Sequence, residues 1–130
     1  MGFGEEEGYG SSNTVVFNMS LATLQRIDSL MRRLSAFLVL RVPVAAERCA
    51  FEFYKEVFPF LTPEERAEAG GLWAGVIAAR VPVPGKARYS GLFASLHVFD
   101  FWLRDKMLSH GLLMARGESP EFAIQKVGSR

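Results

Sequence analysis

The sequence contains a single cysteine, Cys49, among its 130 residues. One cysteine forms no disulfide within the chain and supplies no cluster of cysteine ligands for a metal ion. Long apolar runs are missing as well, because charged residues or prolines interrupt each run before the about 18 residues that a membrane helix needs. The amino terminus lacks the basic segment and apolar core of a secretory signal. We therefore expect a soluble, intracellular protein without a transmembrane segment.

Motifs of catalysis and of cofactor binding are also missing. The sequence has no Walker loop, dinucleotide-binding glycine pattern, zinc-ligand spacing or EF-hand loop. His97 and His110 do not stand in a spacing that indicates a catalytic triad. Glu64, Glu65 and Glu68 lie where acidic residues cap a helix and interact favourably with its dipole. We therefore expect no enzymatic activity, no cofactor and no small-molecule substrate.

Apolar residues, in contrast, make up 49% of the chain and include eleven phenylalanines. A chain of this length buries one core, so we expect a single domain over residues 14–130. Residues 1–13 contain four glycines and three consecutive glutamates, which predicts a flexible arm. Much of the apolar sequence falls on more than one face of the expected helices. We therefore expect copies of this chain, or related subunits, to cover part of that surface.

The amino-terminal half of the domain predicts two helices. Ser20 is a good N-cap, so the first helix is expected over residues 21–34, and the second is expected over residues 45–58. Between them, Pro43 disfavours helical geometry at the preceding residue. The chain therefore either kinks or reverses its direction at Pro43.

The carboxy-terminal half predicts two more main helices and a short terminal one. The sequence Thr62-Pro63-Glu64-Glu65 has the residues of a capping box, so a third helix begins there. A fourth helix is expected over residues 89–116, and a short one over residues 119–126. Arg-Val-Pro-Val occurs at residues 41–44 and again at 80–83, which is consistent with an old duplication of a helical hairpin. The predicted fold class is all-α, either two helical hairpins or a kinked long helix with a bundle.

Basic residues recur every seven or eight positions between residues 20 and 60. At about 100° per residue, this spacing places them within one quarter of the circumference of a helix. The expected basic stripe consists of Arg26, Arg33, Arg41, Arg48 and Lys55. A row of cations neutralises successive phosphates of a duplex without reading its sequence. We predict that the stripe binds nucleic acid, together with Lys86 and Arg88 on the connection before the fourth helix.

Two other interpretations are consistent with the sequence. In the first, the stripe is the solvated face of a bundle, and its side chains extend over apolar neighbours. In the second, a strand over residues 14–19 and the two following helices resemble the ribbon-helix-helix layout of dimeric DNA-binding regulators. The expected strand contains no arginine or lysine to read base edges. A dimeric helical regulator is the alternative function.

The layout as a whole resembles the major capsid proteins of filamentous archaeal viruses. The shared features are a small, helical, cysteine-poor, arginine-rich chain with a loose arm, an early basic helix and an aromatic carboxy-terminal half. The resemblance implies that subunit pairs wrap double-stranded DNA with their amino-terminal helices, while residues 89–116 make subunit contacts outside. The glutamates at residues 5–7 depart from the basic arms of some members. We expect a self-assembling structural protein of a virion, assembled in the host cytoplasm, or alternatively a cytoplasmic protein.

Overall fold

The computed structural model describes residues 19–112 of the chain. Its elements, in chain order, are α2 (Leu21–Leu40), α3 (Pro43–Val57), the short 3₁₀ helix η1 (Phe58–Phe60), α4 (Pro63–Ala78) and α5 (Ser90–Ser109). The predicted all-α fold with four main helices is confirmed, and no strand occurs within the described range. The expected arm at residues 1–13 and the expected short helix at 119–126 lie outside that range. Among residues 19–112, no helix combines the length and apolarity of a membrane span.

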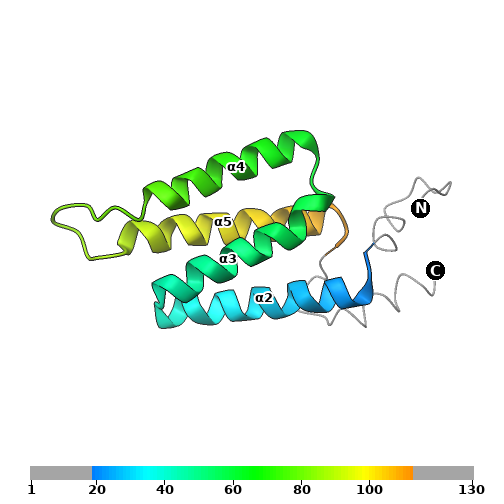
Figure 1. The fold of residues 1–130 in the computed structure, drawn as a ribbon, viewed down its shortest axis with the longest axis horizontal. Coiled ribbons are helices and arrows are strands. Elements are labelled where there is room, and N and C mark those ends of the chain that lie inside the picture. The colour runs from blue at the N-terminus through cyan, green and yellow to red at the C-terminus, as the bar shows by residue number, and fades with distance from the viewer. Residues whose placement is uncertain (1–18, 113–130) are drawn as a thin grey trace.

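The four helices form two antiparallel hairpins, α2 with α3 and α4 with α5 (Figure 1). α3 and α5 pack against each other in the middle of the bundle. α2 and α4 flank this central pair on opposite sides. The beginning of α2 and the end of α5 lie at the same end of the bundle, and the turns within the two hairpins lie at the other end.

The chain reverses between α2 and α3. Arg41 ends α2 in the left-handed conformation, with φ of 56°. The backbone N–H groups of Arg41 and Val42 donate to the carbonyls of Leu38 and Phe37, which closes the turn. Pro43 then stands in the first turn of α3, where a helix has no use for the N–H that proline lacks. The alternative of two helical hairpins is therefore confirmed, and the kinked long helix is excluded.

Two of the predicted helix ends are wrong. The first helix continues beyond residue 34 to Leu40, because Phe37 and Leu38 extend its buried face into the bundle. The fourth helix ends at Ser109 and does not reach residue 116. Gly111 takes a left-handed backbone with φ of 73°, and the next N–H, of Leu112, donates to the carbonyl of Met107. A glycine that closes a helix in this way is the usual stop signal.

The repeated tetrapeptide occupies the turn of each hairpin but folds in two ways. In the first copy, residues 41 and 42 form the tight reversal and residues 43 and 44 begin α3. Residues 80–83 begin the longer connection between α4 and α5, which no helix enters until Ser90. Pro84 and Gly85 follow the second copy, and Gly85 has φ of 81°, so a helix does not start there. The repeat therefore marks equivalent positions in the topology without giving equivalent turns.

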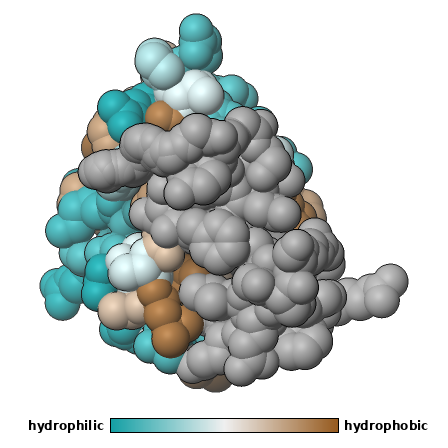
Figure 2. Space-filling model, turned by 90° about the vertical axis from the view of Figure 1, so that its right-hand side faces the viewer, coloured by the Kyte–Doolittle hydropathy of each residue, from teal (hydrophilic) through white to brown (hydrophobic). Residues whose placement is uncertain are grey.

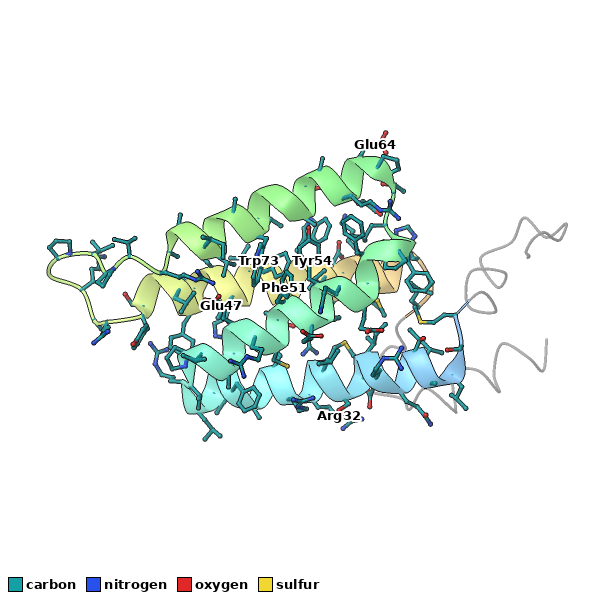
Figure 3. All side chains as sticks on the ribbon, in the orientation of Figure 1. Arg32, Glu47, Phe51, Tyr54, Glu64 and Trp73 are labelled. Atoms are coloured by element: carbon teal, nitrogen blue, oxygen red, sulfur yellow. The ribbon has the colours of Figure 1, made fainter. Side chains whose placement is uncertain are left out.

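The core joins α3, α4 and α5 through a cluster of aromatic rings. Tyr54 packs edge-on against Phe99, with ring centroids 5.2 Å apart, and Trp73 lies 5.3 Å from Phe99. Tyr54 and Trp73 lie between the helices that carry them (Figure 3). Phe99 is fully buried.

Seen from the end of the bundle where α2 begins, hydrophilic residues dominate the coloured outer surface, with a small apolar patch between them (Figure 2).

The Arg104 guanidinium connects α5 to α2 through hydrogen bonds. Arg104 donates to the carboxylate of Asp100, one turn earlier on α5, at a distance of 2.8 Å. The same guanidinium donates to the backbone carbonyl of Met31 and to the hydroxyl of Ser35, both on α2. Asp100 is buried, so its charge needs this partner.

The predicted capping box at the start of α4 is confirmed. The Thr62 hydroxyl accepts from the Glu65 N–H at 3.1 Å, and the Glu65 carboxylate accepts from the Thr62 N–H at 2.9 Å. Glu65 also lies 2.7 Å from the imidazole of His110 at the end of α5. Burial raises the pKa of Glu65, but the hydrogen bonds from Thr62 and His110 outweigh burial, so the net pKa is below its ordinary value.

The Glu65 charge predicts how stability depends on pH. A carboxyl with a lowered folded pKa stabilises the fold above its unfolded pKa of about 4.3 and loses this contribution as pH falls through the folded pKa. We expect Glu65→Gln to unfold in less urea than the parent chain at neutral pH, with the difference shrinking below about pH 4. The control is Glu64→Gln, an exposed neighbour in the same helical turn. A constant difference between Glu65→Gln and the parent chain from pH 7 to pH 3 would contradict the expectation.

Candidate nucleic-acid interface

A groove of about 390 Å³ runs between α2 and α3. Three of the seven predicted nucleic-acid-binding residues line it: Arg26, Arg33 and Arg48. Arg26 and Arg33 come from α2, and Arg48 comes from the antiparallel helix α3. The reversal at Pro43 therefore brings together, across the groove, arginines that are up to 22 positions apart in the sequence. We call these three residues the groove arginines.

The seven- or eight-residue spacing predicted that the five basic residues lie along one helix. In the structure they do not. The chain reversal folds the stripe in two at Arg41, which ends α2. The Arg41 guanidinium turns toward α5 and stacks over the ring of Phe93, 4.3 Å from its centroid. Lys55 pairs with Glu52 at 3.2 Å and does not line the groove. Local spacing predicts helices but not which of their faces pack together.

A second group of basic residues lies at the hairpin-turn end of the bundle, where α5 begins. Arg88 immediately precedes α5, and its guanidinium lies 5.0 Å from the centroid of the Tyr89 ring. Arg41 reaches the first turn of the same helix through Phe93. Lys86 is exposed on the connection before them. The predicted site thus divides into the groove arginines and this group of three at the start of α5.

Five of the seven predicted residues differ from the other arginines and lysines within residues 19–112 in having neither an ion pair nor a hydrogen bond from the side chain to a carbonyl. The basic residues outside the predicted set are all engaged with acids or carbonyls within residues 19–112: Arg32 with Asp28, Arg80 with Glu47, Arg104 with Asp100, Lys106 with Asp105, and Arg66 with the carbonyls of Phe58 and Pro59. Of the seven predicted residues, Arg26 pairs with Glu56 and Lys55 with Glu52. The other five form no ion pair within the part of the chain that the structure describes: Arg33, Arg41, Arg48, Lys86 and Arg88. All five are exposed.

The acids of the groove are already engaged. Glu56 and Glu52 line the groove with the arginines, and each holds a cation, Arg26 and Lys55 respectively. Arg33 and Arg48 therefore provide the charge that an incoming anion meets. A bound phosphate competes with no acid for these two guanidinium groups, which present several N–H donors in a fixed fork.

Cys49, at the bottom of this groove, has a structural role. Its Sγ donates to the carbonyl of Leu30 at 3.3 Å, and the side chain is buried. Burial raises the pKa of the thiol, and the charge of Arg33 only partly opposes this rise. The thiol is therefore protonated at neutral pH, as expected for a buried apolar residue. No group of histidine, cysteine and acidic side chains that could hold a metal occurs among residues 19–112.

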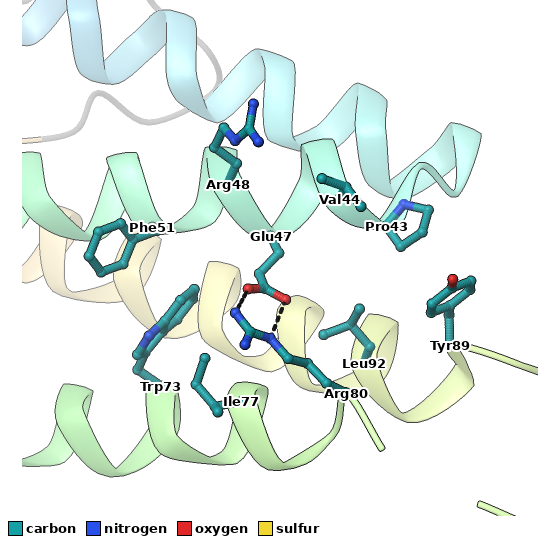
Figure 4. Close-up of a pocket in the computed structure, with 10 residues that line it drawn as sticks. All are labelled: Pro43, Val44, Glu47, Arg48, Phe51, Trp73, Ile77, Arg80, Tyr89 and Leu92. Carbon is teal, nitrogen blue, oxygen red and sulfur yellow. Dashed lines mark hydrogen bonds and ion pairs between the residues drawn. The ribbon is translucent and has the colours of Figure 1, made fainter. Parts of the chain in front are cut away.

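A second cavity, of about 710 Å³, opens between α3, α4 and the start of α5 (Figure 4). Glu47 of α3 and Arg80, just after α4, form a bidentate ion pair within it, with Arg80 Nε 3.0 Å from Glu47 Oε1. Phe51, Trp73 and Ile77 supply an apolar wall. The sequence did not indicate this cavity, because 33 residues separate Glu47 from Arg80 and no local spacing links them. Glu47 and Arg80 satisfy each other, whereas Arg48, which also borders this cavity, has no ion pair within residues 19–112.

Comparison with protein-family models, curated proteins and solved structures finds no match. The function is therefore argued from the arrangement of the side chains. The strand of the ribbon-helix-helix interpretation, at residues 14–19, lies outside the described residues except for Met19, which stands in a bend.

Proposed function

We propose that this chain is a structural, self-assembling protein that binds the backbone of double-stranded DNA without sequence specificity, as a capsid-type protein of a virion does. The observation that carries the proposal is the set of exposed cations that have no ion pair within residues 19–112. Arg33 and Arg48 are the centre of this set, because they border one groove from two helices. Arg41, Lys86 and Arg88 extend it to the start of α5.

Exposed arginines without acidic partners suit a phosphate backbone for a physical reason. A cation that already holds a carboxylate must lose that contact before it binds a phosphate, which reduces the gain. An unpaired guanidinium loses only water and releases counterions from the duplex as it binds. Contacts to phosphates fix the position of a protein on DNA but carry no sequence information. A site built from these five cations would therefore bind duplexes regardless of their sequence.

The self-assembly part of the proposal is supported by the apolar residues that the bundle leaves in contact with solvent. Val39 is 80% exposed, Phe101 78%, Val81 71% and Leu40 70%. Single exposed apolar residues are common, but gatherings of large ones mark surfaces that other molecules cover. Val39 and Leu40 lie together in the last turn of α2. We infer that neighbouring subunits cover such surfaces in an assembly.

A binding assay at several salt concentrations tests the proposal. The purified chain is titrated into two labelled duplexes of equal length and unrelated sequence, at salt concentrations from about 50 to 200 mM. We expect equal affinities for the two duplexes and a linear fall of log affinity with log salt. Electron microscopy of the same mixtures should show extended particles. Absence of binding at the lowest salt would contradict the proposal, and a strong preference for one duplex with a discrete dimer would favour the regulator.

A further inference from the structure

The outward face of α5 carries a row of exposed residues that no other helix within residues 19–112 covers. Phe101 is 78% exposed, Val98 56% and Leu108 50%. Their neighbours on the inward face, Phe99 and Leu103, are fully buried. α5 is therefore apolar on both sides, and only one side is used by the bundle. A second apolar side of this kind is typical of a helix that packs against a further partner.

The polar residues on the same face have a symmetric arrangement. His97 lies four residues before Phe101, and Asp105 lies four residues after it. Residues four apart form one ridge along the surface of a helix. All three are exposed, and 70% of the Asp105 side chain is accessible. The ridge therefore has an imidazole at one end, a phenyl ring in the middle and a carboxylate at the other end.

We propose that this ridge is a self-association surface, on which α5 packs antiparallel against α5 of a second copy of the chain, with Phe101 next to the two-fold axis. A two-fold axis at Phe101 places His97 of each copy beside Asp105 of the other, because both residues are equally far from the axis. The imidazole N–H then donates to the carboxylate twice in each dimer. The two phenyl rings, which water now surrounds, cover each other.

The same residues argue against a parallel pair. In a parallel arrangement, each His97 faces the other His97 and each Asp105 faces the other Asp105, so the two carboxylates repel each other and neither has a donor from the second copy. Asp105 also pairs with Lys106 on its own helix, at 3.6 Å. This contact is long and exposed, and a carboxylate has lone pairs for a second donor. Lys106 therefore does not prevent contact between Asp105 and the second copy.

The dimer leaves the basic groove accessible, because all residues that line the groove belong to α2 and α3. The inference names the partner in the self-assembly proposed above, and its biological role rests on that proposal. Two helices about 30 Å long that pack against each other bury less area than a standard interface, which covers about 800 Å² per partner. We therefore expect a reversible dimer with a dissociation constant in the micromolar range.

Sedimentation equilibrium of the full chain without DNA tests the pairing. We expect the parent chain to dimerise, and Phe101→Glu to stay monomeric at concentrations where the parent chain is mostly dimeric. The control is Val44→Glu, which introduces the same charge at a similarly exposed apolar position on α3 and should dimerise as the parent chain does. Circular dichroism verifies that both variants keep their helices. A monomeric parent chain at all concentrations, or equal loss of dimer in both variants, would overturn the inference.

A charge exchange tests the antiparallel geometry. His97→Asp should weaken the dimer roughly tenfold, because it replaces two symmetric contacts by two pairs of facing carboxylates, and Asp105→His should weaken it because it removes both contacts. The double variant exchanges the two ends of the ridge and should recover affinity to within about threefold of the parent chain. Additive weakening in the double variant would overturn the geometry.

DNA binding by the same variants keeps the two proposals apart. Phe101→Glu should bind a duplex too short for two subunits as tightly as the parent chain does. If the parent chain binds DNA but forms no dimer, only the proposed pairing of α5 is overturned. An intact dimer that binds no duplex overturns only the proposed function.

Discussion

Replacing Arg33 and Arg48 together by glutamine is expected to reduce the affinity of the chain for duplex DNA roughly 50-fold at about 0.1 M salt. Each phosphate contact contributes about 0.9 to the slope of log affinity against log salt, so two lost contacts lower the slope by about 1.8. If the two proteins bind equally at 1 M salt, this difference in slope makes the variant bind about 1.8 decades more weakly than the parent chain at 0.1 M salt. Both side chains are exposed, so the substitutions should leave the bundle folded.

The matched control removes the same charge from cations that have partners. Arg32→Gln combined with Lys106→Gln also lowers the net charge by two, but Arg32 is held by Asp28 and Lys106 by Asp105. Arg32 also points outward from α2 (Figure 3). We expect the control to change affinity by no more than about threefold. Equal losses in the two double variants, measured by fluorescence anisotropy, would show that net charge alone drives binding and that the groove is not the site.

Replacing Phe99 by alanine is expected to lower the free energy of unfolding by about 3–5 kcal/mol. Phe99 is fully buried and contacts Tyr54 of α3 and Trp73 of α4, so its ring joins three helices. Its removal leaves a cavity that the surrounding rings cannot fill without moving the helices. Urea denaturation followed by circular dichroism measures the difference.

Phe101→Ala is the matched control, since it removes the same ring two positions further along the same helix. Phe101 is 78% exposed, and its loss should change the free energy of unfolding by about 0.5 kcal/mol or less. The comparison is made at a dilution where the chain is monomeric, because a dimer through α5 would stabilise the parent chain by mass action. Similar losses for Phe99→Ala and Phe101→Ala would contradict the packing of α5.

Local signals in the sequence predicted the helices and several of their contacts. Thr62 caps α4 and Ser20 caps α2. Both could be predicted because an N-cap interacts only with the first turn of its own helix. The pairs of Asp28 with Arg32 and of Asp100 with Arg104 follow from positions one helical turn apart. In each case the interacting groups are close in the chain, so their spacing determines their geometry.

Contacts between distant segments were beyond such reasoning. The pair of Arg26 with Glu56 forms because the chain reverses at Pro43, and the sequence left both a reversal and a kink open, although the repeated Arg-Val-Pro-Val favoured a reversal. Arg80 meets Glu47 only after both hairpins have packed. The groove arginines were selected for a regular spacing on one helix, yet Arg48 reaches the groove from the opposite helix. The sequence therefore provided candidate residues but not their arrangement in space.

Chemical modification of arginines in the presence and absence of duplex DNA tests the central claim most directly. Phenylglyoxal reacts with accessible guanidinium groups, and mass spectrometry of the digested chain gives the reaction rate of each arginine. We expect bound duplex to slow modification of Arg33 and Arg48 strongly, while Arg32, the neighbour of Arg33 on the outer side of α2, reacts at an unchanged rate. Equal rates for Arg33 and Arg48 with and without bound duplex would contradict the account.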